Sequence, residues 1–392
     1  MSALKKSAFL GPHVGSLWHV ARGNKNPSNV LNNDGDTVPS PRGGDISVAR
    51  LKALMLLSVF VFHSSGVLEF IKTEPIVPAQ FLRAFFEPMS WCLGAFFCIS
   101  GYYTAIYGTR VQGYFDLLKR RSRTLLIPYL LWNSVYIVAF IAGPLLGAAF
   151  KGRRVQSGLF SFASVVDGVL GVTNYPADIP LWYIRNLFLC IMLYPLLKWF
   201  CRKHCGLPII LAMAIVLGVL HPFMPSVLAD QYLKSYILPS FCLGVYFRER
   251  SISPHVFDRS PVLNIALALL MLFAKLNWIC LPFTQWILER KLVYLAVLPF
   301  WLMLAKYLGS FEVDGTFDKF FVKPSFFIYA SHALLGSAMV RIFAPIVPET
   351  PCKFFILAAV FLFGGGALIC ISSMLLSKCF PGIYALLTGG RK

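Results

Sequence analysis

The chain has 392 residues, of which 57% are hydrophobic and only 14% are charged, and its mean hydropathy is +0.68. A soluble domain carries about 25% charged residues, so this composition excludes an ordinary soluble protein and predicts an all-α, polytopic membrane protein. The net charge is +19. No basic domain with interleaved aromatic residues stands apart from the apolar segments, so we expect no nucleic-acid partner.

The first 45 residues differ from the rest of the chain. They are rich in Gly, Asn, Pro and Ser around NKNPSNVLNNDGDTVPSPRGGD and lack a periodic apolar pattern able to form a core. No continuous apolar region follows the early lysines, so the segment is not typical of a cleavable signal peptide. We expect residues 1–45 to form a disordered cytosolic tail, residues 46–380 the membrane domain and residues 381–392 a short cytosolic C-terminal tail.

Ten apolar segments are candidates for membrane spans, because a helix needs about 20 residues to cross a bilayer. In chain order they are 51–70, 88–107, 124–150, 181–200, 204–229, 235–247, 261–282, 292–307, 324–343 and 354–377. The segment 235–247 is short, and Lys275 interrupts the segment 261–282.

The basic residues predict how these spans are oriented, because Lys and Arg collect in short cytosolic loops. Basic loops follow the second, fourth and sixth spans, at RVQGYFDLLKRRSR, KWFCRKHC and RERS, and the N-terminal tail is basic as well. This alternation places both termini in the cytosol. The loop KGRRVQ at 151–156 opposes the pattern, since it follows the third span and would face outward.

The first span contains a histidine, His63. An ionisable group at membrane depth is costly and indicates function by default. Lys52 precedes it by eleven residues, so the two side chains lie within about 20° of each other on one helix face and about 16 Å apart along the axis, whereas Arg50 points to the opposite side. Two structural alternatives stay open: Lys52 extends to the lipid headgroups, and His63 bonds a neighbouring helix.

The second and third spans add polar groups near the membrane. Ser100 and Gly101 interrupt an apolar run, and a small residue allows close approach of the backbone to a helix or to a ligand. Arg120 and Arg123 lie three residues apart and are neighbours on a helix. Their guanidinium groups match phosphate oxygens. A positive-inside signal is the alternative, which explains the charges but not their pairing.

Later in the chain, Trp182 and Arg185 begin the fourth span. An interfacial Trp is common, but Arg185 would lie on the outer side, where the positive-inside rule does not favour it. His332, beside Ser331, is a second intramembrane histidine.

Most of the ten cysteines lie in apolar spans, where thiols behave as small hydrophobic groups rather than as disulfide partners. Cys201, His204 and Cys205 have a spacing similar to that of metal ligands. Three such residues in a predicted cytosolic loop do not predict a zinc site, and we expect no metal.

Five features in this order resemble the membrane-bound acyltransferase 3 family over about residues 46–380: a basic residue eleven positions before a histidine, FFCISGYY, KRRSRTLLIPYLLW, PLWYIRN and SFFIYASHALL. The resemblance implies a ten-helix enzyme of the bacterial inner membrane. Such an enzyme takes an acyl group from cytosolic acyl-CoA, most commonly acetyl-CoA, and delivers it to a hydroxyl of a carbohydrate or lipo-oligosaccharide on the far side.

The resemblance also implies roles for individual residues. His63 matches the catalytic histidine of the family, and Lys52 lies where many members have arginine. The pair Ser100 and Gly101 matches its Ser-Gly turn, and Trp182 matches its Trp-aromatic pair. The R-x-x-R motif linked to the CoA phosphates corresponds to Arg120 and Arg123.

The expected chemistry is acyl transfer with imidazole as the base. His63 takes the proton from the acceptor hydroxyl as its oxygen attacks the thioester. Ser100, His332 or backbone groups then donate to the oxyanion, where one donor typically contributes about 3 to 4 kcal/mol.

Binding of the two substrates is expected at opposite ends of one helix face. CoA phosphates bind Lys52, Arg120 and Arg123 at the cytosolic mouth, while the pantetheine arm extends toward His63. The residues expected to bind the acceptor are Trp182, Arg185 and Glu69. Two other classes stay open: a proton- or anion-coupled transporter of a glycan or related solute, since intramembrane His, Lys and Arg also build ion pathways, and a non-catalytic scaffold of a polysaccharide export complex.

Overall fold

The structure is a computed structural model that describes residues 44–72, 75–110, 113–150, 161–203, 205–310 and 315–390. The predicted tail, apart from residues 44 and 45, lies outside the described residues, as do the basic loop 151–156 and His204.

Every regular element in the described ranges is helical, as predicted. The first half contains α1 (Gly44–His63), η1 (Ser64–Phe70), α2 (Ala79–Phe86), η2 (Glu87–Cys92), α3 (Leu93–Arg110), α4 (Tyr114–Arg121), η3 (Ser122–Leu126), α5 (Ile127–Phe150), α6 (Phe162–Leu170), η4 (Ile179–Leu181), α7 (Trp182–Met192) and α8 (Tyr194–Arg202). The second half contains α9 (Gly206–Leu220), η5 (His221–Phe223), η6 (Val227–Tyr232), α10 (Ile237–Glu249), η7 (Pro254–Arg259), α11 (Pro261–Lys275), α12 (Pro282–Glu289), α13 (Val293–Ala296), α14 (Leu298–Ser310), η8 (Asp318–Val322), α15 (Ser325–Phe343), α16 (Lys353–Ala359), η9 (Val360–Gly365), α17 (Gly366–Cys379) and α18 (Pro381–Thr388).

Within the described residues, five helical stretches are long and apolar enough to cross a membrane: Ser47–Phe70, Ala79–Thr109, Gly206–Phe223, Ser325–Phe343 and Lys353–Cys379. Two bent pairs of helices raise the number to seven if each pair counts as one span. The chain is thus a multi-pass membrane protein, while the count of ten spans and the cytosolic termini stay predictions.

Local chemistry explains where predicted spans are bent or short. The predicted span 181–200 is divided into α7 and α8, which meet at 64°, because Pro195 in the first turn of α8 lacks the N–H that a continuous helix needs. The predicted span 235–247 corresponds to α10, whose 13 residues extend about 20 Å. That length is less than the roughly 30 Å of a hydrocarbon core.

Large apolar side chains cover the outside of several helices. Only 22% of the span Gly206–Phe223 is buried inside the protein, and only 33% of an apolar 18-residue stretch within Lys353–Cys379. Soluble proteins rarely expose continuous apolar surfaces of this kind, so lipid is the expected neighbour of these helices.

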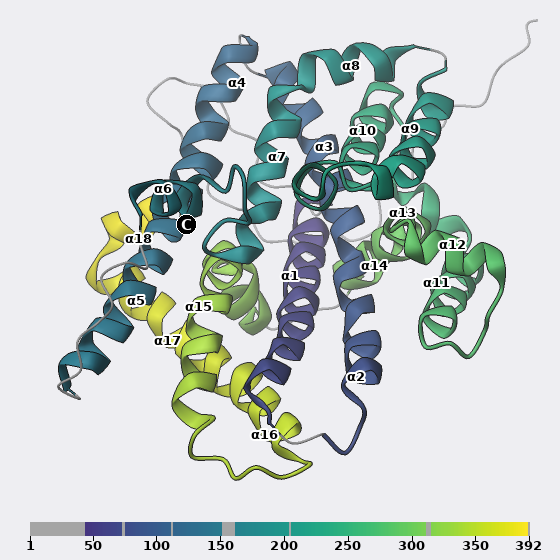
Figure 1. Ribbon diagram of the computed structural model, residues 1–392. Coiled ribbons are helices and arrows are strands. Elements are labelled where there is room, and N and C mark those ends of the chain that lie inside the picture. Colours follow the sequence, from purple (N-terminus) through teal and green to yellow (C-terminus); the bar gives the residue numbers. More distant parts are fainter. Residues whose placement is uncertain are drawn as a thin grey trace, which may run out of the picture. The chain divides into compact units, whose positions relative to one another are not determined.

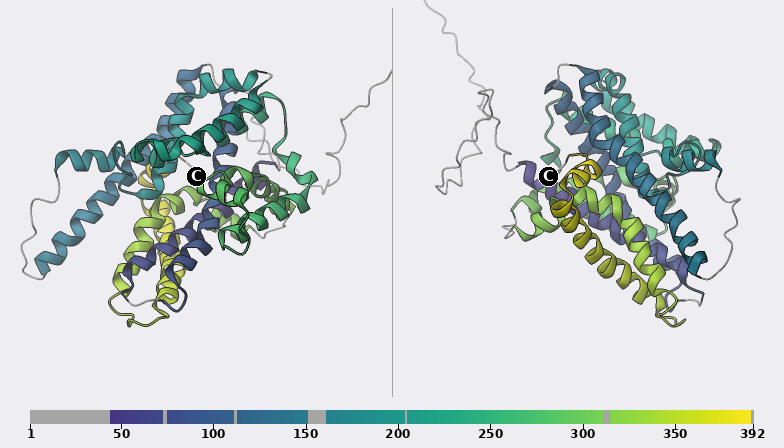
Figure 2. Two further views of the ribbon diagram at one scale, coloured as in Figure 1. Left: turned by 45° about the vertical axis from the view of Figure 1, so that its right-hand side comes forward. Right: turned by 90° about the vertical axis from the view of Figure 1, so that its left-hand side faces the viewer.

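The central packing involves α1, α3, α10, α14 and α15. Figure 1 shows α1 near the middle of this bundle, with α15 on one side and α14 on the other, and both pack against it. α5 and α6 lie against each other at the edge, as the turned view of Figure 2 shows. Residues 381–388, expected to belong to a tail, form α18, which packs on α5, α15 and α17.

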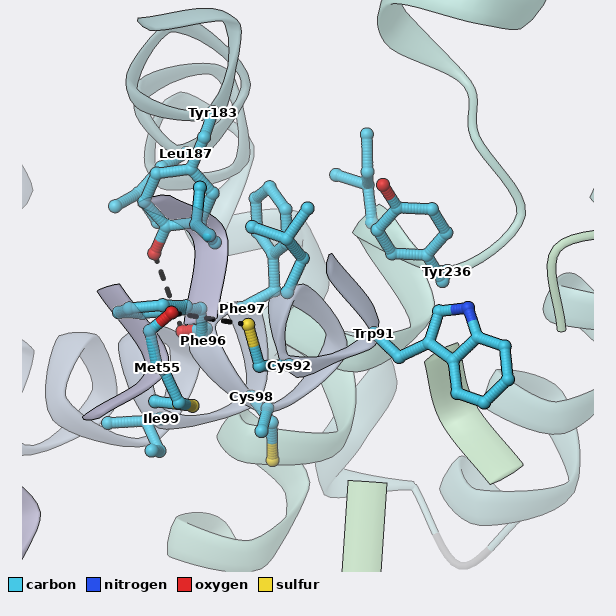
Figure 3. Close-up of a cluster of buried hydrophobic side chains, with 14 of the residues drawn as sticks. Met55, Trp91, Cys92, Phe96, Phe97, Cys98, Ile99, Tyr183, Leu187 and Tyr236 are labelled. Atoms are coloured by element: carbon cyan, nitrogen blue, oxygen red, sulfur yellow. Dashed lines mark hydrogen bonds between the residues drawn. The ribbon is translucent and has the colours of Figure 1, made fainter. Parts of the chain in front are cut away.

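The core next to the site is built from tightly packed aromatic and sulfur-containing side chains. In Figure 3, Met55 of α1 lies beside Cys92 of η2, whose thiol donates to the Met55 carbonyl at 3.5 Å. Phe96 and Phe97 of α3 pack in the same cluster near Tyr183 of α7. This cluster fixes α1, α3 and α7 against one another.

Candidate active site

One face of α1 lines two cavities in succession. Lys52, Leu56 and Val59 line the first cavity, and His63, four residues after Val59, lines the second. The shared face agrees with the predicted eleven-residue spacing of Lys52 and His63. Arg50 is directed elsewhere and forms an ion pair with Asp318 at 2.9 Å.

The first cavity, which we call the Lys52 cavity, has a volume of about 490 Å³. The Lys52 ammonium lies 4.8 Å from the ring centroid of Tyr103, and the Arg121 guanidinium lies 5.1 Å from that of Tyr107. All four residues line the cavity, and none of its described lining residues carries a carboxylate. The cavity is therefore electropositive and suits an anionic ligand.

Ser100 and Tyr183 form a polar spot on the otherwise apolar part of the Lys52 cavity. The Ser100 hydroxyl lies 3.0 Å from the Tyr183 hydroxyl, and both residues line the cavity. The Tyr183 hydroxyl also donates to the Phe96 carbonyl at 3.5 Å (Figure 3). Gly101 does not face the cavity: a Cβ at Gly101 would overlap the Phe241 carbonyl oxygen of α10, so this small residue serves helix packing.

The second cavity, which we call the His63 cavity, has a volume of about 210 Å³. Glu69 lines it, as do Tyr136, Ser337 and Arg341. His63 is half-buried, and no residue of the described ranges forms a hydrogen bond with its ring. The cavity therefore brings one basic imidazole together with hydroxyl, carboxylate and guanidinium groups.

α15 faces α1 across both cavities and runs in the same order. Tyr329 lines the Lys52 cavity, and Ala333, Ser337 and Arg341 line the His63 cavity. These residues are four apart and share one helix face. That spacing is a signal in the sequence that would have identified Arg341, which was not predicted.

A partition separates the two cavities, which differs from the expected continuous path for the pantetheine arm. The Tyr329 hydroxyl donates to the Pro180 carbonyl. Tyr329 lines the Lys52 cavity, while Pro180 lines the His63 cavity. The hydrogen bond thus joins a lining residue of one cavity to a lining residue of the other, and sequence spacing within α1 alone cannot reveal it.

His332, three residues after Tyr329, lines neither cavity. Its side chain is only 2% exposed, and its ring centroid lies 5.0 Å from that of His63. Nδ1 lies 2.6 Å from the Tyr329 carbonyl oxygen. Nε2 is buried and has no partner among the described residues.

Arg120 and Arg123 line one cavity, and Lys52 does not belong to it. They line a third cavity of about 1050 Å³ with Lys119 and Asp116. Arg121 faces the Lys52 cavity instead. The buried side chains of Leu117 and Leu125, each four residues from Arg121, mark the inward face of this helix and would have identified it.

Trp182 and Arg185 line neither the Lys52 cavity nor the His63 cavity. The Lys234 ammonium lies 3.6 Å from the Trp182 ring centroid. Burial lowers the pKa of Lys234 to about 7, and Lys291 adds to this effect. Arg185 donates to the carbonyls of Gly171 and Gln231, which commits its guanidinium to holding these loops.

Of the three residues with metal-like spacing, the structure describes Cys201 and Cys205. Cys201 is buried and donates to the Cys242 carbonyl at 3.4 Å, while Cys205 is exposed and His204 lies outside the described residues. No group of three metal-ligating side chains is present in the ranges that the structure describes.

Comparison with known proteins identifies the family. A family described as an acyltransferase domain, acyltransferase 3, matches residues 46–377. The succinoglycan biosynthesis protein ExoH of Rhizobium meliloti (strain 1021) is 28% identical over 187 residues, which are 47% of this chain and 47% of that protein. The match thus spans about half the length of this relative. No solved structure matches the chain. Because the family match extends over most of the membrane domain, the chain belongs to the acyltransferase 3 family, and its apolar helices make it a multi-pass membrane protein.

Proposed function

We propose that the protein is an O-acyltransferase of the bacterial inner membrane that moves an acyl group, acetyl in the first instance, from cytosolic acyl-CoA to a hydroxyl of a cell-surface glycan or lipo-oligosaccharide. Family membership supports the acyl transfer. The name of the relative, a succinoglycan biosynthesis protein, supports a polysaccharide acceptor.

The observation that carries the proposal is the order of the two cavities along α1. The Lys52 cavity begins beside the basic end of α4, and the His63 cavity lies beside η1, on which α16 packs. A donor and an acceptor that approach from opposite sides of the membrane need such an arrangement.

The Lys52 cavity is the proposed donor site. Its volume lies within the roughly 300–1,000 Å³ of small-molecule sites, and its two cations match the phosphates of CoA. Lys52 and Arg121 hold the phosphates nearest the pantetheine arm. Arg120 and Arg123, on the other side of the same helical segment, remain proposed ligands for the nucleotide end.

The His63 cavity is the proposed acceptor site. At about 210 Å³ it is smaller than a complete small-molecule site and suits one part of a larger glycan. Glu69, Ser337 and Arg341 offer both acceptors and donors for hydroxyl groups. Trp182 and Arg185, proposed from the sequence for acceptor binding, support the neighbouring loops, and their contribution to this site is indirect.

The residues of the two cavities supply the proton transfers that the proposed reaction needs. His63 takes the proton of the acceptor hydroxyl, and the oxygen attacks the thioester carbonyl carbon. Ser100 donates to the oxyanion after its hydroxyl hydrogen turns away from the Tyr183 oxygen. The C–S bond then breaks, the thiolate leaves with the proton that His63 returns, and the products are an ester and CoA-SH. The Tyr329 ring must move aside for the acyl group to meet the hydroxyl.

Mass spectrometry of surface glycans from a deletion strain tests the proposal. We expect the strain to lose an acyl substituent, and the wild-type gene to restore it. The His63→Ala variant, present in the membrane at the wild-type level, should not restore it. His221→Ala is the matched control, because His221 lies outside both cavities and pairs with Asp230, and it should restore the substituent. Restoration by His63→Ala would refute the assigned base.

A further inference from the structure

We infer that His332 is a positioning residue that accepts a hydrogen bond from His63 and thereby fixes which nitrogen of His63 acts as the base. This inference rests on the proposed function, because it assigns a partner to the base of that reaction. It differs from the expected role of His332 as an oxyanion donor.

The first step is that the contact with the Tyr329 carbonyl determines the tautomer of His332. A neutral imidazole has one N–H donor and one acceptor nitrogen. Nδ1 lies 2.6 Å from the Tyr329 carbonyl oxygen, which can only accept, so Nδ1 carries the hydrogen. The ring has no second N–H left for an oxyanion, and Nε2 presents a lone pair.

The second step is that Nε2 of His332 lacks a hydrogen-bond donor. A buried polar atom without a partner costs roughly 1–3 kcal/mol, and Nε2 has no partner among the described residues. The aromatic neighbours of His332 are Phe60, Tyr329 and His63, with ring centroids 5.8, 6.1 and 5.0 Å away. Phe60 has no polar atom, and the Tyr329 hydroxyl already donates to Pro180.

The third step is that His63 can supply the missing donor. Its centroid separation of 5.0 Å brings a ring N–H within hydrogen-bonding reach of Nε2 once the two nitrogens face each other. His63 has no hydrogen-bond partner among the described residues, so rotation of its ring breaks no hydrogen bond within them.

The consequence is a base held in one orientation. When one nitrogen of His63 donates to His332, the other presents its lone pair to the His63 cavity, where the acceptor hydroxyl binds. The same bond stabilises the imidazolium that forms when His63 takes the proton, as the orienting third group does in other nucleophile–base arrangements.

The test that does not depend on activity is nuclear magnetic resonance of the full-length protein in detergent, labelled with ¹⁵N-histidine. Two-bond ¹⁵N–¹H correlations distinguish the tautomers, and the His63→Ala and His332→Ala variants assign the signals. We expect His332 to carry its hydrogen on Nδ1 and His63 to show a single tautomer. A hydrogen on Nε2 of His332 would overturn the inference.

A matched pair of substitutions tests the hydrogen bond itself. A glutamine amide reaches about as far as Nε2 of histidine, whereas an asparagine amide reaches only as far as Nδ1. We expect His63 to keep one tautomer in His332→Gln and to show both in His332→Asn. An unchanged single tautomer in His332→Asn would also overturn the inference.

Turnover provides the functional readout, with acetyl-CoA as donor and glycan extracted from the deletion strain as acceptor. We expect kcat to fall roughly tenfold or more in His332→Asn, with the KM for acetyl-CoA unchanged and most of the rate retained in His332→Gln. Equal losses in both variants would contradict the inference. An inactive wild-type protein would instead refute the proposed function, and the tautomer of His332 would still decide the inference.

Discussion

Two cations in the Lys52 cavity lie against aromatic faces. Lys52 lies over Tyr103 and Arg121 over Tyr107. A cation over an aromatic ring is stabilised by about 0.5–2 kcal/mol. Lys52 and Arg121 thus bring two basic groups to the lining of one cavity.

Substitutions of these cations test whether the phosphates of CoA bind in the Lys52 cavity or in the cavity lined by Arg120 and Arg123. In Lys52→Gln combined with Arg121→Gln, we expect the dissociation constant of CoA to rise at least tenfold, because each hydrogen bond to a charged group contributes about 1.5–3 kcal/mol. Isothermal titration calorimetry of the purified protein in detergent measures it. The matched variant combines Arg120→Gln with Arg123→Gln and should weaken binding less. The opposite ranking would place the phosphates nearest the pantetheine arm in the third cavity.

At the scale of helices, the contact between α3 and α10 fixes one wall of the Lys52 cavity. Gly101 meets the Phe241 carbonyl, and a Cβ on Gly244 would overlap the Cys98 carbonyl. The two backbones approach this closely only because both residues lack a side chain. Ser100, next to Gly101, is thereby held in the cavity beside Tyr183.

The Gly101→Ala variant tests this contact. The added methyl group has no space between the two backbones, and overpacking typically costs about 1–3 kcal/mol or more. We expect a lower midpoint of thermal unfolding in detergent, by several degrees. Gly382→Ala, in α18, is the matched control because its Cβ would meet no atom within 4 Å. Equal midpoints for the two variants would contradict the packing role of Gly101.

Features that depend on spacing within one helix were predictable from the sequence, and contacts between distant segments were not. The eleven-residue interval predicted the shared face of Lys52 and His63, and the three-residue interval predicted the pairing of Arg120 with Arg123. The partition joins Tyr329 to Pro180, which are 149 residues apart. No periodic pattern reports such a contact, because it arises only when α15 packs against the start of α7.

At the scale of the whole membrane domain, the basic residues and the two cavities indicate the same direction. The last turn of α4 carries Lys119, Arg120 and Arg121, and Arg121 lines the Lys52 cavity. Basic residues favour the cytosolic side. The His63 cavity lies toward α16, which Figure 1 shows at the opposite end from α4 and α8. The donor would thus enter from the cytosol and the acceptor from outside.

Two exposed cysteines test this orientation, because the predicted topology places them on opposite sides. Cys205 lies between α8 and α9, in the predicted cytosolic loop, and Cys352 lies just before α16. Each is kept in turn while the other exposed cysteines of the described ranges, including Cys280 and Cys379, are replaced by serine. A membrane-impermeant maleimide applied to right-side-out vesicles should label Cys352 directly and Cys205 only after permeabilisation.

A variant without these exposed cysteines measures labelling of the buried thiols, whose access to the reagent is limited by packing. The reverse pattern, with Cys205 labelled first, would place His63 on the cytosolic side. An acceptor on the cell surface would then never meet the base, so glycan acylation outside the cell would require a different catalytic residue. Two results together would support the proposed arrangement. If the maleimide labels only Cys352 before permeabilisation, and if loss of Lys52 and Arg121 weakens CoA binding, then the donor site and His63 lie on opposite sides of the partition.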